Sequence, residues 1–267
     1  MKFSLLLSAV LMLVIYGCSS SKEAAGSNEE IQNAEQISGP PGSTDAKNKA
    51  MEYFINGSIY EAKGDNASAI LEFQDALKYD TSAGIYYALA KNYFYLSKIP
   101  QALQYSEKAV SMNSHQLEYK SLLADVFSAA SQFDSAAVVL EDMIAQDSSS
   151  LTSYYRLARI YEDTKPLRAI NIYKKLTEII GSDWNVLSRV AELYEKLGNM
   201  DEAANTVKEL LKIDPGNDAL YKLLVQYYTK AEEYDNALEA VNDLLELKPD
   251  DLEAREQIGR ASCRERV

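Results

Sequence analysis

The stretch that decides the fold is AELYEKLGNMDEA, at residues 191–203. Alanines stand at both ends of this stretch, and Gly198 divides it into two segments rich in helix-forming residues. Apolar residues recur at i, i+3, i+4 and i+7 from Leu187 to Tyr194, which predicts an amphipathic helix. Gly198 then marks a tight turn, where a positive φ is often needed. The stretch therefore predicts two amphipathic helices that pack against each other across a short turn.

The same pattern recurs six times from residue 46 onward, at intervals of 33 or 34 residues. Each recurrence has a small residue at Gly57, Ala90, Ala124, Ala158 and Ala191, and the sixth has the larger Val225 at that position. An aromatic residue follows at Tyr60, Tyr93, Phe127, Tyr161, Tyr194 and Tyr228. An alanine stands in the second helix at Ala69, Ala102, Ala136, Ala169, Ala203 and Ala237. One such unit cannot bury its apolar face alone, so the units are expected to stack into a solenoid.

These positions resemble the tetratricopeptide repeat family, whose units have small residues at positions 8 and 20 and a large aromatic residue at position 11. The resemblance implies an all-α fold, a right-handed α-solenoid of about six helix–turn–helix repeats within residues 46–250. The fourth repeat departs from the pattern, because Lys165-Pro166-Leu167 replaces the turn and is one residue short. The expected repeats are residues 50–82, 83–116, 117–150, 151–183, 184–217 and 218–251, and residues 252–257 begin a seventh.

The N-terminus carries an apolar run at residues 3–16, directly after Lys2. A membrane-spanning helix needs about 20 apolar residues, so this run is read as a secretory signal. Its end, Ile15-Tyr16-Gly17-Cys18, resembles the bacterial lipobox. The resemblance implies that residues 1–17 are removed and that Cys18 is lipidated, and Ser19 then favours the outer membrane. A plain signal peptide with an incidental cysteine is the alternative.

The segments on either side of the repeats are expected to lie outside the fold. Residues 18–45 are rich in Ser, Gly, Asn, Glu and Pro and contain only two large aliphatic residues, Ile31 and Ile37. Such a composition cannot bury a core, so it predicts a flexible tether. The last ten residues, 258–267, resemble the translation of a sequencing adapter, which would make them an artefact that interrupts the natural chain. A genuine basic helix end is the alternative.

The composition excludes several classes of function. Lys and Arg number 27 against 40 Asp and Glu, a net charge of −13, whereas nucleic-acid binding needs a basic surface. One His and two Cys supply neither a Cys/His metal cluster nor the usual nucleophile pairings. The chain also lacks a glycine-rich phosphate loop followed by Lys and Ser or Thr. We therefore expect a protein that is not an enzyme and binds no cofactor or metal.

In the tetratricopeptide family, the first helix of each repeat lines a concave groove. Carried over to this chain, the resemblance implies an aromatic patch in the first two repeats: Phe54, Tyr87, Lys91, Phe94 and Tyr95. The third repeat offers Ser121 and Asp125, and the fourth to sixth offer Tyr155, Arg156, Arg159, Arg189, Glu192, Lys222 and Gln226. The family's clamp for two carboxylates, Lys and Asn at positions 5 and 9 of one repeat, is not reproduced.

Three of these groove residues, Arg159, Arg189 and Lys222, form a basic cluster in an acidic protein. A planar guanidinium pairs bidentately with a carboxylate, so the cluster is a candidate receptor for an acidic peptide group. The alternative is that the three cations pair with Glu162, Glu192 and Glu195 on neighbouring helices. For the aromatic patch, the alternative is packing within the repeats.

These expectations combine into a membrane-anchored scaffold of the cell envelope, facing the periplasm, which binds protein or peptide partners through its groove. Two alternatives stay open. One is a structural subunit or pilotin-like factor of an outer-membrane assembly, with apolar patches on its convex face as well. The other is the accessory region of a longer enzyme.

Overall fold

The computed structural model describes residues 44–256. The expected signal peptide, the lipidated Cys18, most of the tether and the adapter-like residues 258–267 lie outside the described residues. Within the described range every regular element is a helix. The helices are α2 (Thr44–Ala62), α3 (Asn66–Leu77), α4 (Ala83–Tyr95), α5 (Ile99–Met112), α6 (Leu117–Ala129), α7 (Phe133–Gln146), α8 (Leu151–Thr164), α9 (Pro166–Ile180), α10 (Trp184–Lys196), α11 (Met200–Ile213), α12 (Asp218–Lys230) and α13 (Tyr234–Leu247).

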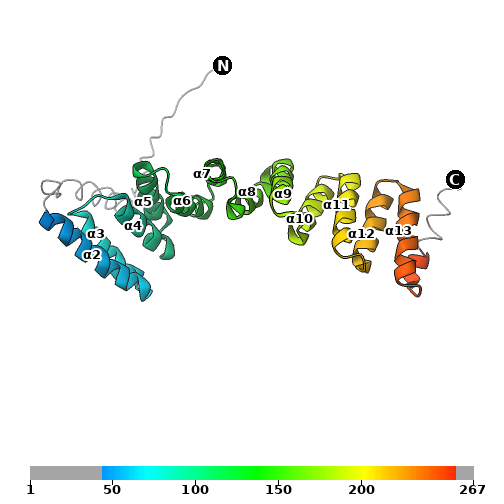
Figure 1. Ribbon diagram of the computed structural model, residues 1–267, viewed down its shortest axis with the longest axis horizontal. Helices are drawn as coiled ribbons and strands as arrows, with labels where there is room; N and C mark the ends of the chain where they lie inside the picture. Colours follow the sequence, from blue (N-terminus) through cyan, green and yellow to red (C-terminus); the bar gives the residue numbers. More distant parts are fainter. Residues whose placement is uncertain (1–43, 257–267) are drawn as a thin grey trace, which may run out of the picture. The chain divides into compact units, whose positions relative to one another are not determined.

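The helices belong to two compact units, which divide the chain between Gln101 and Ala102. In the first unit, α3 packs against both α2 and α4. In the second unit, each helix from α6 to α13 packs against the next one along the chain, as the order of the ribbons in Figure 1 shows. Each unit is thus a row of neighbouring helices, in which contacts connect residues close in sequence.

Small residues allow the two helices of a pair to approach closely. The alanines at the second small position are buried in every pair: Ala69, Ala102, Ala136, Ala169 and Ala203 have no exposed area, and Ala237 keeps 2%. At the first small position, Ala90, Ala124 and Ala158 are equally inaccessible. The tyrosines between them, such as Tyr93, Tyr161 and Tyr194, are 4 to 7% exposed. The tyrosine-rich composition therefore serves mainly to fill the space between helices.

The turns inside the helix pairs explain two glycines of the sequence. Gly64 and Gly198 have φ values of 77° and 74°, in the left-handed region that glycine adopts without steric strain because it has no Cβ. Ser97, Ser131 and Glu232 occupy the same region at the corresponding turns, with φ from 57° to 63°. An L-residue pays about 1–2 kcal/mol for that conformation, so these three turns carry a small local strain.

The fourth pair turns differently, as its shorter sequence predicts. Lys165 ends α8 and begins α9 with an extended φ of −144°. Pro166 is the first residue of α9, where its missing N–H is not needed and its fixed φ suits a helix.

The first helix begins earlier than the sequence predicts. α2 starts at Thr44, two residues before the repeat region expected from residue 46, and its 19 residues exceed the 13 or 14 of the other first helices. Asp45 lies in its first turn and pairs with Lys49 at 3.7 Å, an i,i+4 pair of the kind that stabilises helices. Residues 44 and 45, which we expected in the tether, are therefore helical.

Candidate peptide-binding surface

In the first unit, the predicted aromatic patch divides into packed and exposed rings. Phe54 on α2 stands 5.3 Å from the ring of Phe73 on α3, in a tilted arrangement, so packing within the repeat accounts for part of its surface. Tyr87 and Phe94 on α4 are half-buried. Tyr95, at the end of α4, is 57% exposed. Tyr95 is thus the ring of this patch that solvent reaches most.

Lys91 lies in a polar cluster between the two first helices. Its ammonium donates to the Glu61 carboxylate of α2 at 2.6 Å and stands 6.0 Å from the centre of the Tyr95 ring. The fully buried amide of Asn92 donates to the same carboxylate at 2.7 Å and to the carbonyl of Ala88 at 2.8 Å. Removing one partner of such a cluster leaves buried polar groups unsatisfied, so Lys91 holds α2 and α4 together.

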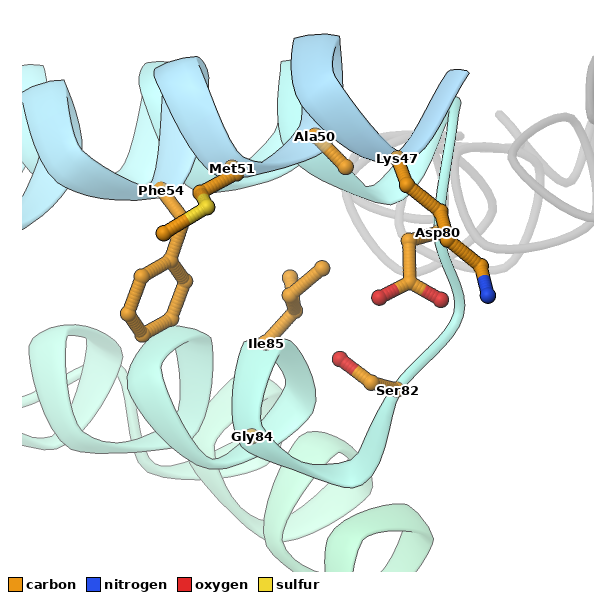
Figure 2. Close-up of a pocket in the computed structure, with 8 residues that line it drawn as sticks. All are labelled: Lys47, Ala50, Met51, Phe54, Asp80, Ser82, Gly84 and Ile85. Atoms are coloured by element: carbon orange, nitrogen blue, oxygen red, sulfur yellow. The ribbon is translucent and has the colours of Figure 1, made fainter. Parts of the chain in front are cut away.

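A hollow opens between the beginning of α2, the connection from α3 to α4 and the beginning of α4. Its volume is about 240 Å³. Figure 2 shows the apolar side chains of Met51, Phe54 and Ile85 gathered on one side. Asp80 and Lys47 stand at the other side. The hollow therefore has an apolar floor and a polar rim.

In the second unit, Arg156 is held by the preceding repeat. Its guanidinium donates to the hydroxyl and the carbonyl of Ser121 at 2.9 and 3.2 Å, and to the carboxylate of Asp125 at 2.5 Å. Burial raises the pKa of Asp125, and the positive charge of Arg156 opposes that rise. Three of the predicted groove residues, Arg156, Ser121 and Asp125, thus form one network of hydrogen bonds with each other.

Arg159 and Arg189 both contribute positive charge near the buried side chain of Tyr173. Tyr173 donates to the carboxylate of Glu162 at 2.6 Å. Burial and this hydrogen bond raise the pKa of Tyr173, while the charges of Arg189 and Arg159 oppose the rise. Arg159 on α8 and Arg189 on α10 thus both act on the charge of the Tyr173 hydroxyl.

The two arginines differ in their partners. Arg189 pairs with Glu192 at 2.9 Å, with side chains 58% and 62% exposed, an arrangement usually worth about 0–1 kcal/mol. Arg159 is exposed and makes no hydrogen bond or ion pair with any residue between 44 and 256. The alternative that these cations pair with acids therefore holds for Arg189, which forms a weak exposed pair, and does not hold for Arg159.

Lys222 does not join the two arginines. Its ammonium pairs with Asp251 at 2.9 Å and lies 3.9 Å from Glu253, and Asp251 also accepts a hydrogen bond from the backbone N–H of Ala254. Lys222 therefore connects α12 to the helical residues 252–256. Gln226, on the same helix, is exposed.

Glu195, the remaining acid considered as a partner of the basic cluster, is used elsewhere. It accepts from the Lys230 ammonium at 2.7 Å and from the Tyr227 hydroxyl at 2.9 Å, so it bridges α10 and α12. Tyr155 on α8 is half-buried, and burial together with the charge of Asp183 raises its pKa. Of the three expected cations, Arg189 pairs with Glu192 and Lys222 with Asp251, while Arg159 has no ion pair among residues 44–256.

Neither a metal site nor a membrane-spanning helix is found among residues 44–256. Between residues 44 and 256, no group of three or more His, Cys, Asp and Glu side chains is arranged to hold a metal ion. No helix of the same range has the length and apolar character needed to cross a bilayer.

The helix pairs are similar to repeats of known proteins, both in sequence and in structure. The sequence profile of the tetratricopeptide repeat matches residues 161–226 and 201–260. The tetratricopeptide repeat protein of Parabacteroides merdae ATCC 43184 is similar with a TM-score of 0.55 and 16% identity, over 81% of this chain and 90% of that one. The crystal structure of MamA is similar with a TM-score of 0.52 and 24% identity, over 58% of this chain and 92% of that one.

One curated relative is similar in sequence, the human Protein O-mannosyl-transferase TMTC1. It is 24% identical over 167 residues, which are 60% of this chain and 19% of the relative. The chain thus spans about a fifth of that protein's length. Together, the helix pairs, the profile and the similar structures confirm the predicted fold class, an all-α solenoid of tetratricopeptide repeats.

The hollow was not predicted from the sequence. Of its lining residues only Phe54 was a predicted groove residue. Gly84 was a usable signal, because it stands at position 2 of its repeat, which faces the groove in the family, and has no side chain to fill that place.

Proposed function

We propose that this chain is a non-catalytic scaffold, which binds protein or peptide segments across its first helices and is held at a membrane of the cell envelope by a lipidated Cys18. Tetratricopeptide folds commonly mediate contacts between proteins, which supports the general role. The anchor, the outer-membrane location and the periplasmic orientation rest on the sequence at residues 15–19.

The observation that carries the binding role is Arg159. In a chain of net charge −13, its guanidinium is exposed and makes no ion pair among residues 44–256. Arg189, whose charge acts on the same Tyr173 hydroxyl as that of Arg159, is paired among these residues only with the exposed Glu192. A carboxylate of a partner would gain charge-assisted hydrogen bonds from this arginine pair at little cost in existing contacts.

The test replaces both arginines. Partners crosslinked to the full chain in cells would be identified and purified, and their binding to Arg159→Ala/Arg189→Ala measured by calorimetry. We expect at least about tenfold weaker binding, equivalent to about 1.4 kcal/mol. The melting temperature should barely change, because neither arginine satisfies a buried acid. Unchanged binding with a lower melting temperature would mean that the arginines are structural.

A matched control removes the same amount of charge elsewhere. Lys175 and Lys212 are exposed residues on the second helices α9 and α11, so Lys175→Ala/Lys212→Ala changes the net charge equally. This control should leave binding intact. A loss equal to that of the arginine variant would show a long-range charge effect rather than a site.

A structural subunit of an outer-membrane assembly is the second candidate. It is favoured by large apolar residues exposed on second helices, with Leu71, Val138 and Leu167 at 63 to 64% exposure. Val138→Ser/Leu167→Ser in the second unit would then release the chain from a purified envelope complex. Retention in that complex, with the arginine variant released, would reject this candidate.

A further inference from the structure

The hollow of the first unit is large enough for an aromatic ring. An apolar cavity of about 150 Å³ is known to hold benzene, and this one measures about 240 Å³. Its apolar side includes Phe54, which can meet a second ring edge to face. It also includes Met51, whose thioether favours contact with aromatic rings and whose side chain is 64% exposed.

The polar rim fits an uncharged peptide backbone. Lys47 and Asp80 contribute opposite charges, so the rim has no net charge. Neither side chain makes a hydrogen bond or ion pair with another residue in the described part of the chain. The Ser82 side chain does not cap α4, and the Ser82 carbonyl accepts from the N–H of Ile85 at 3.1 Å. The N–H groups of the first two residues of α4 therefore have no acceptor inside the helix. Donors and an acceptor therefore stand together where a ligand's amide groups would lie.

We propose that this hollow binds a phenylalanine-sized aromatic side chain of a partner protein, flanked by uncharged backbone. The inference rests on the proposed scaffold function and adds a second, apolar anchor point to it. Residues 19–43 of the chain itself contain no aromatic residue, so the tether cannot supply the ring. Because the rim charges cancel, binding here depends little on salt, whereas binding at exposed arginines weakens as salt rises.

The test uses N-acetyl-phenylalanine amide as the probe, since it combines one ring with two neutral amides. The full-length chain is labelled at the methionine methyl groups, and the Met51 signal, assigned with Met51→Leu, is followed by NMR. We expect a saturable ring-current shift of Met51 that is insensitive to salt. N-acetyl-alanine amide should produce no saturable shift. Equal effects of the two amides, or no effect of either, would overturn the proposal.

Gly84→Leu fills the hollow from α4, and we expect it to weaken probe binding by more than about tenfold. Ala219→Leu is the matched control, at the same position of the repeat that begins with α12, and should bind normally. If Gly84→Leu impairs folding, Met51→Ser removes an exposed lining side chain and should lower saturation transfer to the probe's ring. Full binding by Gly84→Leu, or by Met51→Ser, would refute the proposed site.

Two other occupants give distinct results, and each would overturn the proposal. If the hollow binds a second copy, sedimentation would show a dimer that Gly84→Leu dissociates. If the tether fills it, the probe would bind only after Ile31→Ser/Ile37→Ser. Failure of the probe experiment leaves the proposed function standing, because that function is tested separately at Arg159 and Arg189.

Discussion

Gly57 is the position where one added methyl group should reveal how tightly the first repeat is packed. A Cβ built on Gly57 would stand 2.7, 2.8 and 3.0 Å from three carbons of the Phe73 ring, whereas carbons in contact normally lie about 3.5–4.0 Å apart. The ring cannot easily retreat, because Phe73 is 1% exposed and packs on Phe54. Gly57→Ala therefore forces the α2–α3 pair apart.

Two opposing effects set the size of this change. Overpacking of a core costs about 1–3 kcal/mol, while replacing glycine by alanine inside a helix gains about 1 kcal/mol. Gly57→Ala should therefore lower the free energy of unfolding by about 0–2 kcal/mol. With Phe73→Leu in the background the ring is gone, and the same substitution should stabilise the protein by about 1 kcal/mol.

The assay is a double-mutant cycle by urea denaturation, with hydrogen exchange of α2 and α3 to locate the effect. A coupling free energy of about 1–3 kcal/mol between Gly57 and Phe73 is expected. Protection should fall in the α2–α3 pair of Gly57→Ala and recover in the double variant. A stabilising Gly57→Ala in the Phe73 background, or additive effects, would refute the close approach of the two helices.

Three other predictions concern the turns, the acid response and the anchor. Gly198→Ala should lower the free energy of unfolding by about 1 kcal/mol through the positive φ alone, since a Cβ at this position meets nothing within 4 Å. Ser131→Gly should not lower it, and urea denaturation of the two variants checks both expectations. The hydrogen bonds from Lys230 and Tyr227 lower the pKa of Glu195 from its ordinary value of 4.5. The stability that they add to the folded protein is therefore complete above pH 4.5 and is lost as the pH falls through the pKa of Glu195 in the folded state. Thermal melts of Lys230→Met, run from neutral to acid pH, should show a smaller loss of stability over this pH range. Cys18→Ser should move the protein out of the membrane fraction or leave it unprocessed; equal fractionation and normal processing would reject the lipid anchor.

The helix pairs could be predicted from the sequence because the signal is local and repeated. Alanine at a helix crossing, an aromatic ring three residues after a small one and a turn residue between helices all act within one unit of 33 or 34 residues. The helices α4, α6, α8, α10 and α12 accordingly begin at the first residue of a predicted repeat. The helical state of residues 44 and 45 escaped prediction, because they have no counterpart in the repeating pattern.

The tertiary structure alone decided which groove residues are available to a partner. Arg156, Arg159 and Lys222 look equivalent in sequence, yet Arg156 is bound by Ser121 and Asp125, 35 and 31 residues away, and Lys222 by Asp251. Arg159 is left without an ion pair among residues 44–256. Whether a long side chain meets an acid across a repeat boundary depends on how two helices stack and on which rotamers remain open. The spacing of residues along the chain does not contain that information.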